Sequence, residues 1–221
     1  MTSRLIFVTG ATGYMGRALV AALLARGHRV RALARENSRQ RVPAGAETVI
    51  GNALDAASFA GAIAPADTLV HLIGTPHPSP AKAASFRAVD LVSVDAALAA
   101  ASTAAAATIR HFVYLSVAQP APVMHAYIAV REAAERRIRE SGIAATFLRP
   151  WYVLGPGHRW PCLLLPIYAV CQFLPATRDG AQRLGLVTLE QMVAALVASI
   201  ERGPEGVRIL DVPAIRAAAV D

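Results

Sequence analysis

Lysine, cysteine and asparagine are scarce in this sequence of 221 residues. The two cysteines, Cys162 and Cys171, exclude a fold built on disulfides and a four-cysteine zinc site, and we expect no metal site. Only 17% of the residues are charged, yet 22 Lys and Arg against 15 Asp and Glu give a net charge of +7. Lys82 is the sole lysine, the arginines are dispersed and no nucleic-acid motif is present. We therefore expect a solvated basic surface and no nucleic-acid partner.

Hydrophobic residues are abundant instead, at 55% of the chain, with a mean hydropathy of +0.42. A long uncharged run, between Arg159 and Arg178, approaches the length of a membrane span, but three prolines interrupt it. We expect a buried helix over residues 160–175. A lid over an apolar substrate and a membrane contact confined to this segment stay open. The first apolar stretch, residues 5–9, is too short for the core of a signal peptide, and we expect a cytoplasmic protein.

Apolar runs alternate with amphipathic or alanine-rich stretches along the chain. Strands are expected at residues 5–9, 29–34, 47–50, 68–73, 111–116, 145–148 and 207–210. Helices are expected at residues 14–26, 56–64, 81–106, 126–140 and 189–202. This alternation predicts an α/β fold, a Rossmann-like doubly wound parallel sheet. We expect a single domain over residues 1–221, in which residues 150–221 form a small substrate portion.

A glycine motif stands where the first expected strand meets the first expected helix. Its spacing is Gly10-x-x-Gly13-x-x-Gly16. Gly10 permits a tight turn, Gly13 lets the backbone approach a pyrophosphate at the helix N-terminus, and Gly16 lets the helix pack on the strand. Because the motif follows a strand and begins a series of βα units, it predicts dinucleotide binding.

The segment Thr9–Gly16 resembles the signature of the extended and atypical short-chain dehydrogenase/reductase superfamily. Later segments are similar to it as well, at residues 51–55, 111–116 and 141–150. The resemblance covers residues 4–160 and is strongest to the atypical branch, with NmrA-like, epimerase/dehydratase-like and complex I accessory-subunit-like proteins. It implies that the cofactor is held by Gly10, Thr12, Gly13, Tyr14, Met15 and Gly16 at the turn, by Asn52 and Ala53 near the adenine, by Leu72, Ile73 and Gly74 near the ribose, and by Pro150, Trp151 and Val153 near the nicotinamide.

The residue at the end of the second expected strand indicates whether the dinucleotide is NAD or NADP. An acid there would bind the 2′-hydroxyl of NAD, but this chain has Arg35, about 20 residues beyond the glycines. Arginine can bind a 2′-phosphate through two parallel hydrogen bonds. We therefore expect NADP, while Glu36, the next residue, keeps NAD open.

The catalytic residues that the resemblance implies are a serine and a tyrosine followed four residues later by a lysine. Here they correspond to Ser116, Tyr127 and Arg131, so an arginine replaces the lysine. Four residues is one helical turn, which predicts that Tyr127 and Arg131 share a helix face. No asparagine precedes them in the long expected helix. The three residues could form a working reductase site or a cofactor-binding scaffold without hydride chemistry, or Tyr127 could only pack on its neighbours.

Aromatic side chains follow the sixth expected strand. Because ligands bind beyond the carboxyl ends of parallel strands, Trp151, Tyr152 and Trp160 are candidates for the wall of an apolar substrate pocket, or they pack the loop. His158 is a candidate acid or base. The first hypothesis is an NADP-dependent oxidoreductase of a small apolar carbonyl or alcohol. The alternatives are a dinucleotide-binding regulator or assembly factor without catalysis, and an epimerase or dehydratase.

Overall fold

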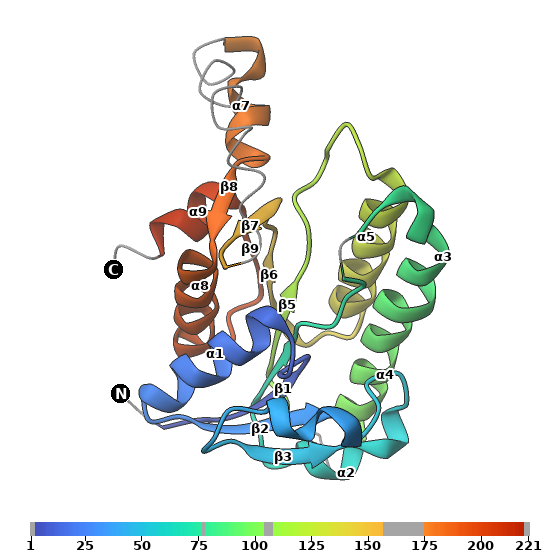
Figure 1. Ribbon diagram of the computed structural model, residues 1–221, viewed down its shortest axis with the longest axis vertical. Coiled ribbons are helices and arrows are strands. Elements are labelled where there is room, and N and C mark those ends of the chain that lie inside the picture. Colours follow the sequence, from blue (N-terminus) through green and yellow to red (C-terminus); the bar gives the residue numbers. More distant parts are fainter. Residues whose placement is uncertain (1–2, 77, 104–107, 157–174, 219–221) are drawn as a thin grey trace.

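A seven-stranded parallel sheet forms the centre of the protein (Figure 1). The computed structural model describes residues 3–76, 78–103, 108–156 and 175–218. In spatial order the strands are β3 (Glu47–Ile50), β2 (Arg29–Ala34), β1 (Leu5–Thr9), β4 (Thr68–His71), β5 (His111–Leu115), β6 (Ala144–Leu148) and β9 (Val207–Leu210). The expected doubly wound α/β architecture is confirmed.

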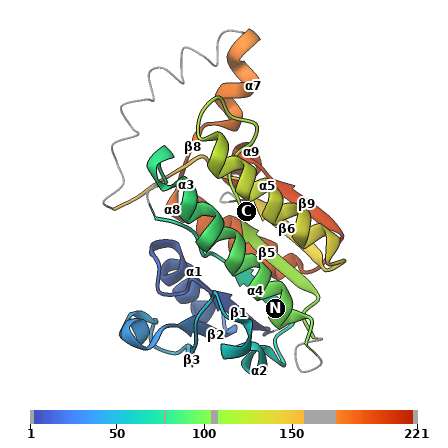
Figure 2. The same ribbon diagram turned by 90° about the vertical axis from the view of Figure 1, so that its right-hand side faces the viewer.

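Helices cover both faces of this sheet. α1 (Tyr14–Ala25) and α8 (Leu189–Arg202) lie on one face, and α2 (Ala60–Ile63), α4 (Val92–Ala101) and α5 (His125–Glu140) lie on the other (Figures 1 and 2). Each buried strand contributes side chains to the cores on both faces of the sheet, because successive side chains point to opposite faces. In β1, Phe7 joins the core beneath α4 and α5, whereas Ile6 and Val8 join the core beneath α1 and α8.

The helix expected over residues 81–106 is interrupted, which corrects the sequence-based prediction. The segment begins with two short turns, η3 (Pro80–Lys82) and α3 (Ala83–Ser85), and continues through a π-helical turn, η4 (Phe86–Leu91), into α4. π-turns of this kind are frequent at functional sites. The turn carries Asp90, whose carboxylate is fully buried and accepts hydrogen bonds from other parts of the chain. The expected helix over residues 56–64 is also divided, into η2 (Ala56–Ser58) and α2.

The chain beyond Pro150 contributes to the main sheet as well as to a small annex. β7 (Tyr152–Leu154) pairs with β8 (Leu186–Thr188) in a separate two-stranded parallel sheet. α7 (Pro175–Arg183) projects from this end of the molecule (Figure 1). α8 then returns to cover the sheet, β9 extends it, and α9 (Val212–Ala217) ends the described chain. Short η1 (Glu36–Arg41) follows β2.

Within the described residues, no helix is both long and apolar enough to cross a membrane. The segment 160–175, for which we expect a buried helix, a lid or a membrane contact, lies almost wholly outside the described residues, as do the two cysteines.

Candidate nucleotide-binding and catalytic site

The strand order reverses between β1 and β4. From β1 the chain proceeds outward to β2 and β3, and then crosses to β4 on the other side of β1. The connections after β1 and β4 therefore leave the sheet toward opposite faces, which opens a crevice at the carboxyl ends of these two strands. Nucleotides bind at such switch points in open α/β sheets.

The glycine turn fills one wall of this crevice. Gly10 has φ of +76°, and a Cβ there would lie 2.9 Å from the carbonyl carbon of Leu72. A Cβ on Gly16 would lie 2.1 Å from the Gly10 oxygen. Neither position tolerates a side chain, so the start of α1, the turn and the chain after β4 pack backbone against backbone.

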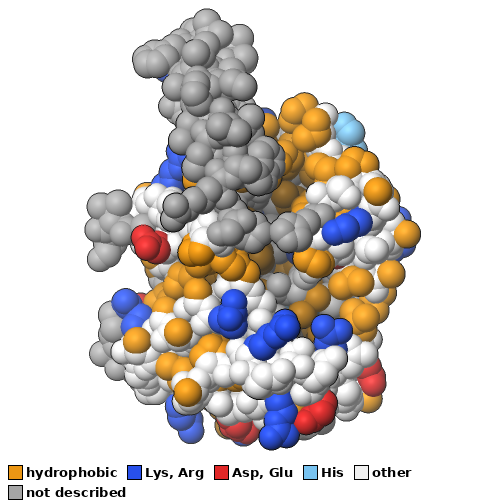
Figure 3. Space-filling model, in the orientation of Figure 1, with side chains coloured by type: hydrophobic (Ala, Val, Ile, Leu, Met, Phe, Trp, Pro, Cys, Tyr) orange, Lys and Arg blue, Asp and Glu red, His pale blue; other side chains and the backbone are white. Residues whose placement is uncertain are grey.

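The N-terminus of α1 is suited to an anion. Gly13 is its N-cap residue, and no side chain caps the first turn. Uncapped backbone N–H groups and the positive end of the helix dipole attract a phosphate. Thr12, Tyr14 and Met15 beside them are half-buried. Figure 3 shows Lys and Arg side chains across the lower half of the face that carries α1. The residues present thus fit a dinucleotide.

The other expected cofactor residues lie at the same edge of the sheet. Arg35 follows β2 and is exposed, and neither a hydrogen bond nor an ion pair joins its guanidinium to another described residue. Asn52 and Ala53 follow β3; the Asn52 amide oxygen accepts the Leu54 N–H at 3.1 Å and shapes the turn. Leu72, Ile73 and Gly74 follow β4 and are half-buried.

The segment after β6 completes this edge. The Pro150 carbonyl accepts the Ala118 N–H at 2.9 Å, which joins the loops after β5 and β6. Trp151 and Tyr152 are half-buried, with their rings edge to face at 5.9 Å. Val153 lies in β7 and is also half-buried. His158 and Trp160, the other expected substrate residues, lie outside the described residues.

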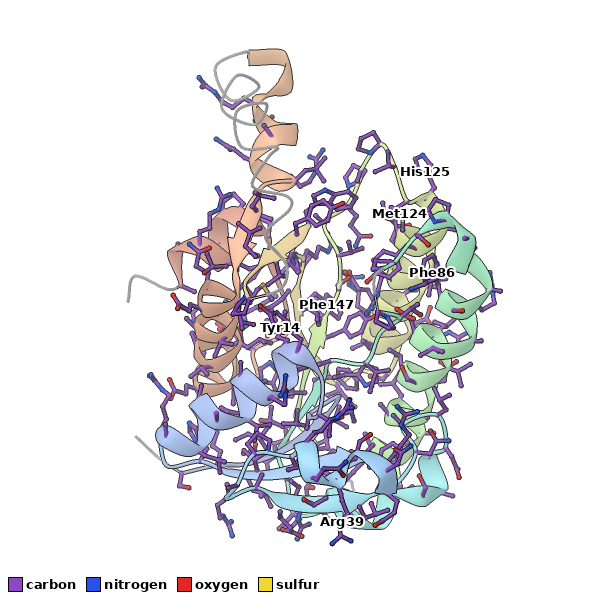
Figure 4. The ribbon with its side chains drawn as sticks, viewed as in Figure 1. Tyr14, Arg39, Phe86, Met124, His125 and Phe147 are labelled. Atoms are coloured by element: carbon purple, nitrogen blue, oxygen red, sulfur yellow. The ribbon has the colours of Figure 1, made fainter. Side chains whose placement is uncertain are left out.

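One close contact ties the annex to the glycine turn. A Cβ on Gly155 would lie 1.8 Å from the Tyr14 hydroxyl oxygen, so the chain after β7 packs directly on the first residue of α1. Figure 4 shows Tyr14 at the start of α1 and Phe86 beside the first turns of α5, at the same end of the sheet. The start of α1 and the first turns of α5 therefore lie at the same end of the sheet, on its opposite faces.

Tyr127 lies in the first turns of α5 and is half-buried. Its ring packs on Phe86 at 4.9 Å, and the Arg131 guanidinium carbon lies 5.1 Å from its centroid. Tyr127 and Arg131 thus share one helix face, as their spacing predicts. The positive charge of Arg131 over the ring is a cation–π contact.

Arg131 is committed to an internal network. Its Nη2 donates to Asp90 Oδ1 at 2.7 Å, and its Nη1 donates to the Tyr114 hydroxyl at 3.0 Å and to the Leu115 carbonyl at 2.8 Å. Both side chains of the ion pair are buried, at 3% and 0% exposure. Burial opposes the charge of Arg131, but Tyr114, Tyr127 and Asp90 raise its pKa, so the guanidinium stays protonated.

Ser116 is also engaged away from Tyr127. Its hydroxyl donates to Glu135 Oε1 at 2.6 Å. Glu135 is buried one helical turn beyond Arg131, and Arg149 binds its two oxygens at 2.9 and 2.6 Å. A cavity of about 270 Å³ opens beside this cluster, lined by Gln119, Pro120, Glu132, Glu135, Arg139 and Arg149. Ser116 therefore has lone pairs to accept a hydrogen bond, while its proton is held by Glu135.

Two buried histidines support the sheet beneath the site. His71 bridges Thr9 Oγ1, 2.9 Å from its Nδ1, and Ser93 Oγ, 3.1 Å from its Nε2. Burial, helped by the charge of Arg131, lowers the pKa of His71 to about 3. Burial, helped by nearby arginines, lowers the pKa of His111 to about 4. Both rings are neutral in the folded protein near neutral pH.

Acid is expected to destabilise the fold through these two rings. Below pH 6.5 these histidines become protonated in the unfolded chain but stay neutral in the folded protein. The free energy of unfolding therefore falls by about 1.4 kcal/mol per pH unit for each histidine. Urea unfolding between pH 6.5 and 5 measures this slope. His111→Gln should remove about half of it, whereas His125→Gln, at an exposed position on α5, should leave it unchanged. A flat profile over this range would contradict the assignment.

Sequence reasoning missed three residues of these networks. Asp90 and Glu135 are the two fully buried acids of the part of the chain that the structure describes, and Thr75 donates to Asp90. The sequence did carry one signal. Glu135 stands four residues beyond Arg131, so the two share a helix face, and an acid on a buried face needs a charged partner. Among the described residues, no group of three or more potential metal ligands gathers.

A family model described as NAD(P)H-binding matches residues 10–157. A ceramide reductase from Caulobacter vibrioides is 30% identical over 195 residues, which are 87% of this chain and 60% of that protein. A 4-hydroxy-2-methyl-3-oxo-4-farnesyl-3,4-dihydroquinoline-1-oxide ketoreductase from Stigmatella aurantiaca is 30% identical over 230 aligned positions, covering 90% of this chain and 65% of that protein. The chain thus spans less than two thirds of the length of these two relatives.

The solved structures agree on the fold. A short-chain dehydrogenase/reductase superfamily protein from Agrobacterium tumefaciens with bound NAD superposes with a TM-score of 0.66 at 20% identity, over 96% of this chain and 81% of that one. The family match covers the glycine turn, the strands β2 to β6 and Tyr127. The chain belongs to the NAD(P)H-binding family.

Proposed function

We propose that this protein is an NADP-dependent reductase that converts a carbonyl group on an apolar substrate to an alcohol. The observation that carries the proposal is Tyr127, a half-buried phenol on α5 with a permanently charged guanidinium 5.1 Å from its ring. It stands at the end of the sheet that carries the glycine turn. The two relatives named above as reductases support the same reaction class.

In this mechanism, NADPH supplies hydride to the carbonyl carbon when it is bound. The Tyr127 hydroxyl gives its proton to the carbonyl oxygen, because a positioned acid is needed where negative charge develops. Arg131 stabilises the phenolate that remains, through space rather than by a hydrogen bond to the ribose. Ser116 has no proton to donate to the ketone, because its own is held by Glu135, but its lone pairs can accept a hydrogen bond from the hydroxyl of the alcohol product. Solvent returns the proton to Tyr127, which balances the reaction.

The preference for NADP rests on Arg35. Its guanidinium is exposed at the end of β2, while the carboxylate of the next residue, Glu36, binds Arg39 at 3.1 Å. Arg39 itself points away from the protein at the lower edge of Figure 4. A cation without a partner among the described residues is therefore available for a 2′-phosphate, and the neighbouring acid is already engaged by a cation.

Arg35→Ser is expected to weaken NADPH binding about tenfold and to leave NADH binding nearly unchanged, because an exposed charge-assisted pair contributes about 1–2 kcal/mol. Fluorescence titration of both dinucleotides measures the effect. Arg41→Ser is the matched control, since Arg41 is exposed at the end of η1 and carries the same charge. Equal loss in both variants would show a general effect of net charge, and tighter NADH binding by the wild type would contradict the NADP assignment.

The substrate we propose is a ketone attached to a long apolar chain. Trp151, Tyr152 and Val153 offer an aromatic and aliphatic wall beyond β6. The two relatives act, by their names, on a ceramide and on a farnesyl-bearing quinoline oxide, and both molecules carry long apolar groups. A panel of ketones with increasing alkyl length, assayed by NADPH oxidation, should show turnover rising with chain length.

A second candidate is a dinucleotide-binding regulator or assembly factor without hydride chemistry. One observation favours it: both polar partners expected for Tyr127 are engaged elsewhere, Ser116 by Glu135 and Arg131 by Asp90. Such a protein would bind NADPH but would transfer no hydride to any ketone, which separates it from the reductase.

A further inference from the structure

The chain that follows β4 forms the second wall of the crevice. This segment, Leu72–Thr75, is called the β4 loop below. Its first residue donates its N–H to the Thr9 carbonyl at 3.2 Å and packs against Gly10, where a Cβ would touch the Leu72 backbone. The β4 loop therefore faces the same space as the glycine turn.

The far end of the β4 loop is attached to a buried acid. The backbone N–H of Thr75 donates to Asp90 Oδ2 at 3.0 Å, and its hydroxyl donates to the same oxygen at 2.6 Å. Gly74 lies directly against the ion pair: a Cβ there would be 2.3 Å from Arg131 Nη2 and 3.3 Å from Asp90 Oδ1. The last two residues of the β4 loop, Gly74 and Thr75, thus both contact the Asp90–Arg131 ion pair.

The buried acid to which the β4 loop is attached is itself held in place. Asp90 is fully buried in the π-turn η4, and its other oxygen binds Arg131 on α5. Arg131 in turn binds Tyr114 and the Leu115 carbonyl at the end of β5. Hydrogen bonds to charged groups are stronger than neutral ones, and burial strengthens them further. A continuous set of bonds therefore runs from β5 and α5 through Asp90 to the β4 loop.

We propose that Thr75 and Asp90 are positioning residues for the dinucleotide: they hold the β4 loop in the conformation that accepts NADPH. The inference rests on the proposed function. Neither residue needs to contact the cofactor. If the loop samples other conformations, only the competent fraction binds, and the apparent dissociation constant rises by the inverse of that fraction.

Thr75→Val tests this directly because it keeps the shape of the side chain and removes only the hydroxyl donor. The backbone N–H still satisfies Asp90, so the fold should persist with nearly the same thermal midpoint. We expect the dissociation constant for NADPH to rise about tenfold. Hydrogen exchange of residues 72–75 should also become faster in the protein without nucleotide. Thr75→Ser restores the hydroxyl and should restore both values.

Asp95→Asn is the matched control, because Asp95 lies on α4 and pairs with Arg137 at the surface. It should leave NADPH affinity and exchange of the β4 loop unchanged. Wild-type affinity in Thr75→Val would overturn the inference, and so would a failure of Thr75→Ser to recover or an equal loss in Asp95→Asn. If the wild type bound neither NADPH nor NADH, the proposed function itself would fail, and this inference with it.

Discussion

Replacing Tyr127 by Phe is expected to lower turnover by about 10²–10⁴-fold while leaving the dissociation constant for NADPH within about twofold of the wild type. The Tyr127 hydroxyl is the proton donor in the proposed reaction, and the substitution removes only this group. The ring contacts with Phe86 and Arg131 remain, at 4.9 and 5.1 Å in the wild type, so the fold and the crevice should be preserved. Steady-state rates with a long-chain ketone and a fluorescence titration of NADPH give the two quantities.

Tyr114→Phe is the matched control. Tyr114 lies in β5, is fully buried and accepts a hydrogen bond from Arg131; burial raises its pKa to about 12. It cannot reach a substrate, so its replacement should change turnover by less than about tenfold, although it should cost some stability. A large loss of turnover in Tyr114→Phe together with normal turnover in Tyr127→Phe would assign the proton to a different group.

Asp90→Ala is expected to lower the free energy of unfolding by about 3–5 kcal/mol, because it leaves the buried charge of Arg131 without its counter-ion. The pair is separated by 2.7 Å and is almost completely shielded from solvent. The variant also removes the acceptor of Thr75, so the β4 loop loses its attachment. Urea unfolding followed by circular dichroism measures the change.

Asp95→Ala and a double variant serve as controls for the Asp90 result. The Asp95–Arg137 pair is exposed, at 42% and 44%, so its loss should cost less than about 1 kcal/mol. Asp90→Leu combined with Arg131→Met removes both charges together and should recover much of the lost stability. A loss below about 1 kcal/mol in Asp90→Ala would contradict the burial of an ionised pair.

Much of the fold could be predicted from local pattern. The strands β1, β2, β3 and β9 and the helix α8 begin and end where the sequence predicts, because apolar runs and capping signals are properties of a few adjacent residues. The long helix could not be predicted in full. Its π-turn is accompanied by bonds from Asp90 to Thr75 and Arg131, which lie 15 and 41 residues away. The pairing of β7 with β8 also joins distant three-residue strands.

The candidate site also combines features that local sequence predicts with features that it does not. The glycine turn could be predicted because the positive φ of Gly10 and the close approach of Gly16 to the Gly10 oxygen arise within one βα unit; the packing of Gly10 on Leu72 could not. The shared face of Tyr127 and Arg131 follows from helical spacing alone. What Arg131 binds could not be predicted, because its partners come from β5 and from η4. The engagement of Ser116 by Glu135 likewise depends on how α5 lies across the sheet.

The most direct test of the proposed reaction is isotope transfer. The protein is incubated with NADPH carrying deuterium at both C4 positions of the nicotinamide and with a panel of long-chain ketones, and the products are analysed by mass spectrometry. We expect wild-type protein to yield alcohol with a single deuteron on the former carbonyl carbon, and Tyr127→Phe to yield almost none. Saturable NADPH binding by the wild type with no deuterated alcohol from any ketone would contradict the reductase and favour a dinucleotide-binding protein.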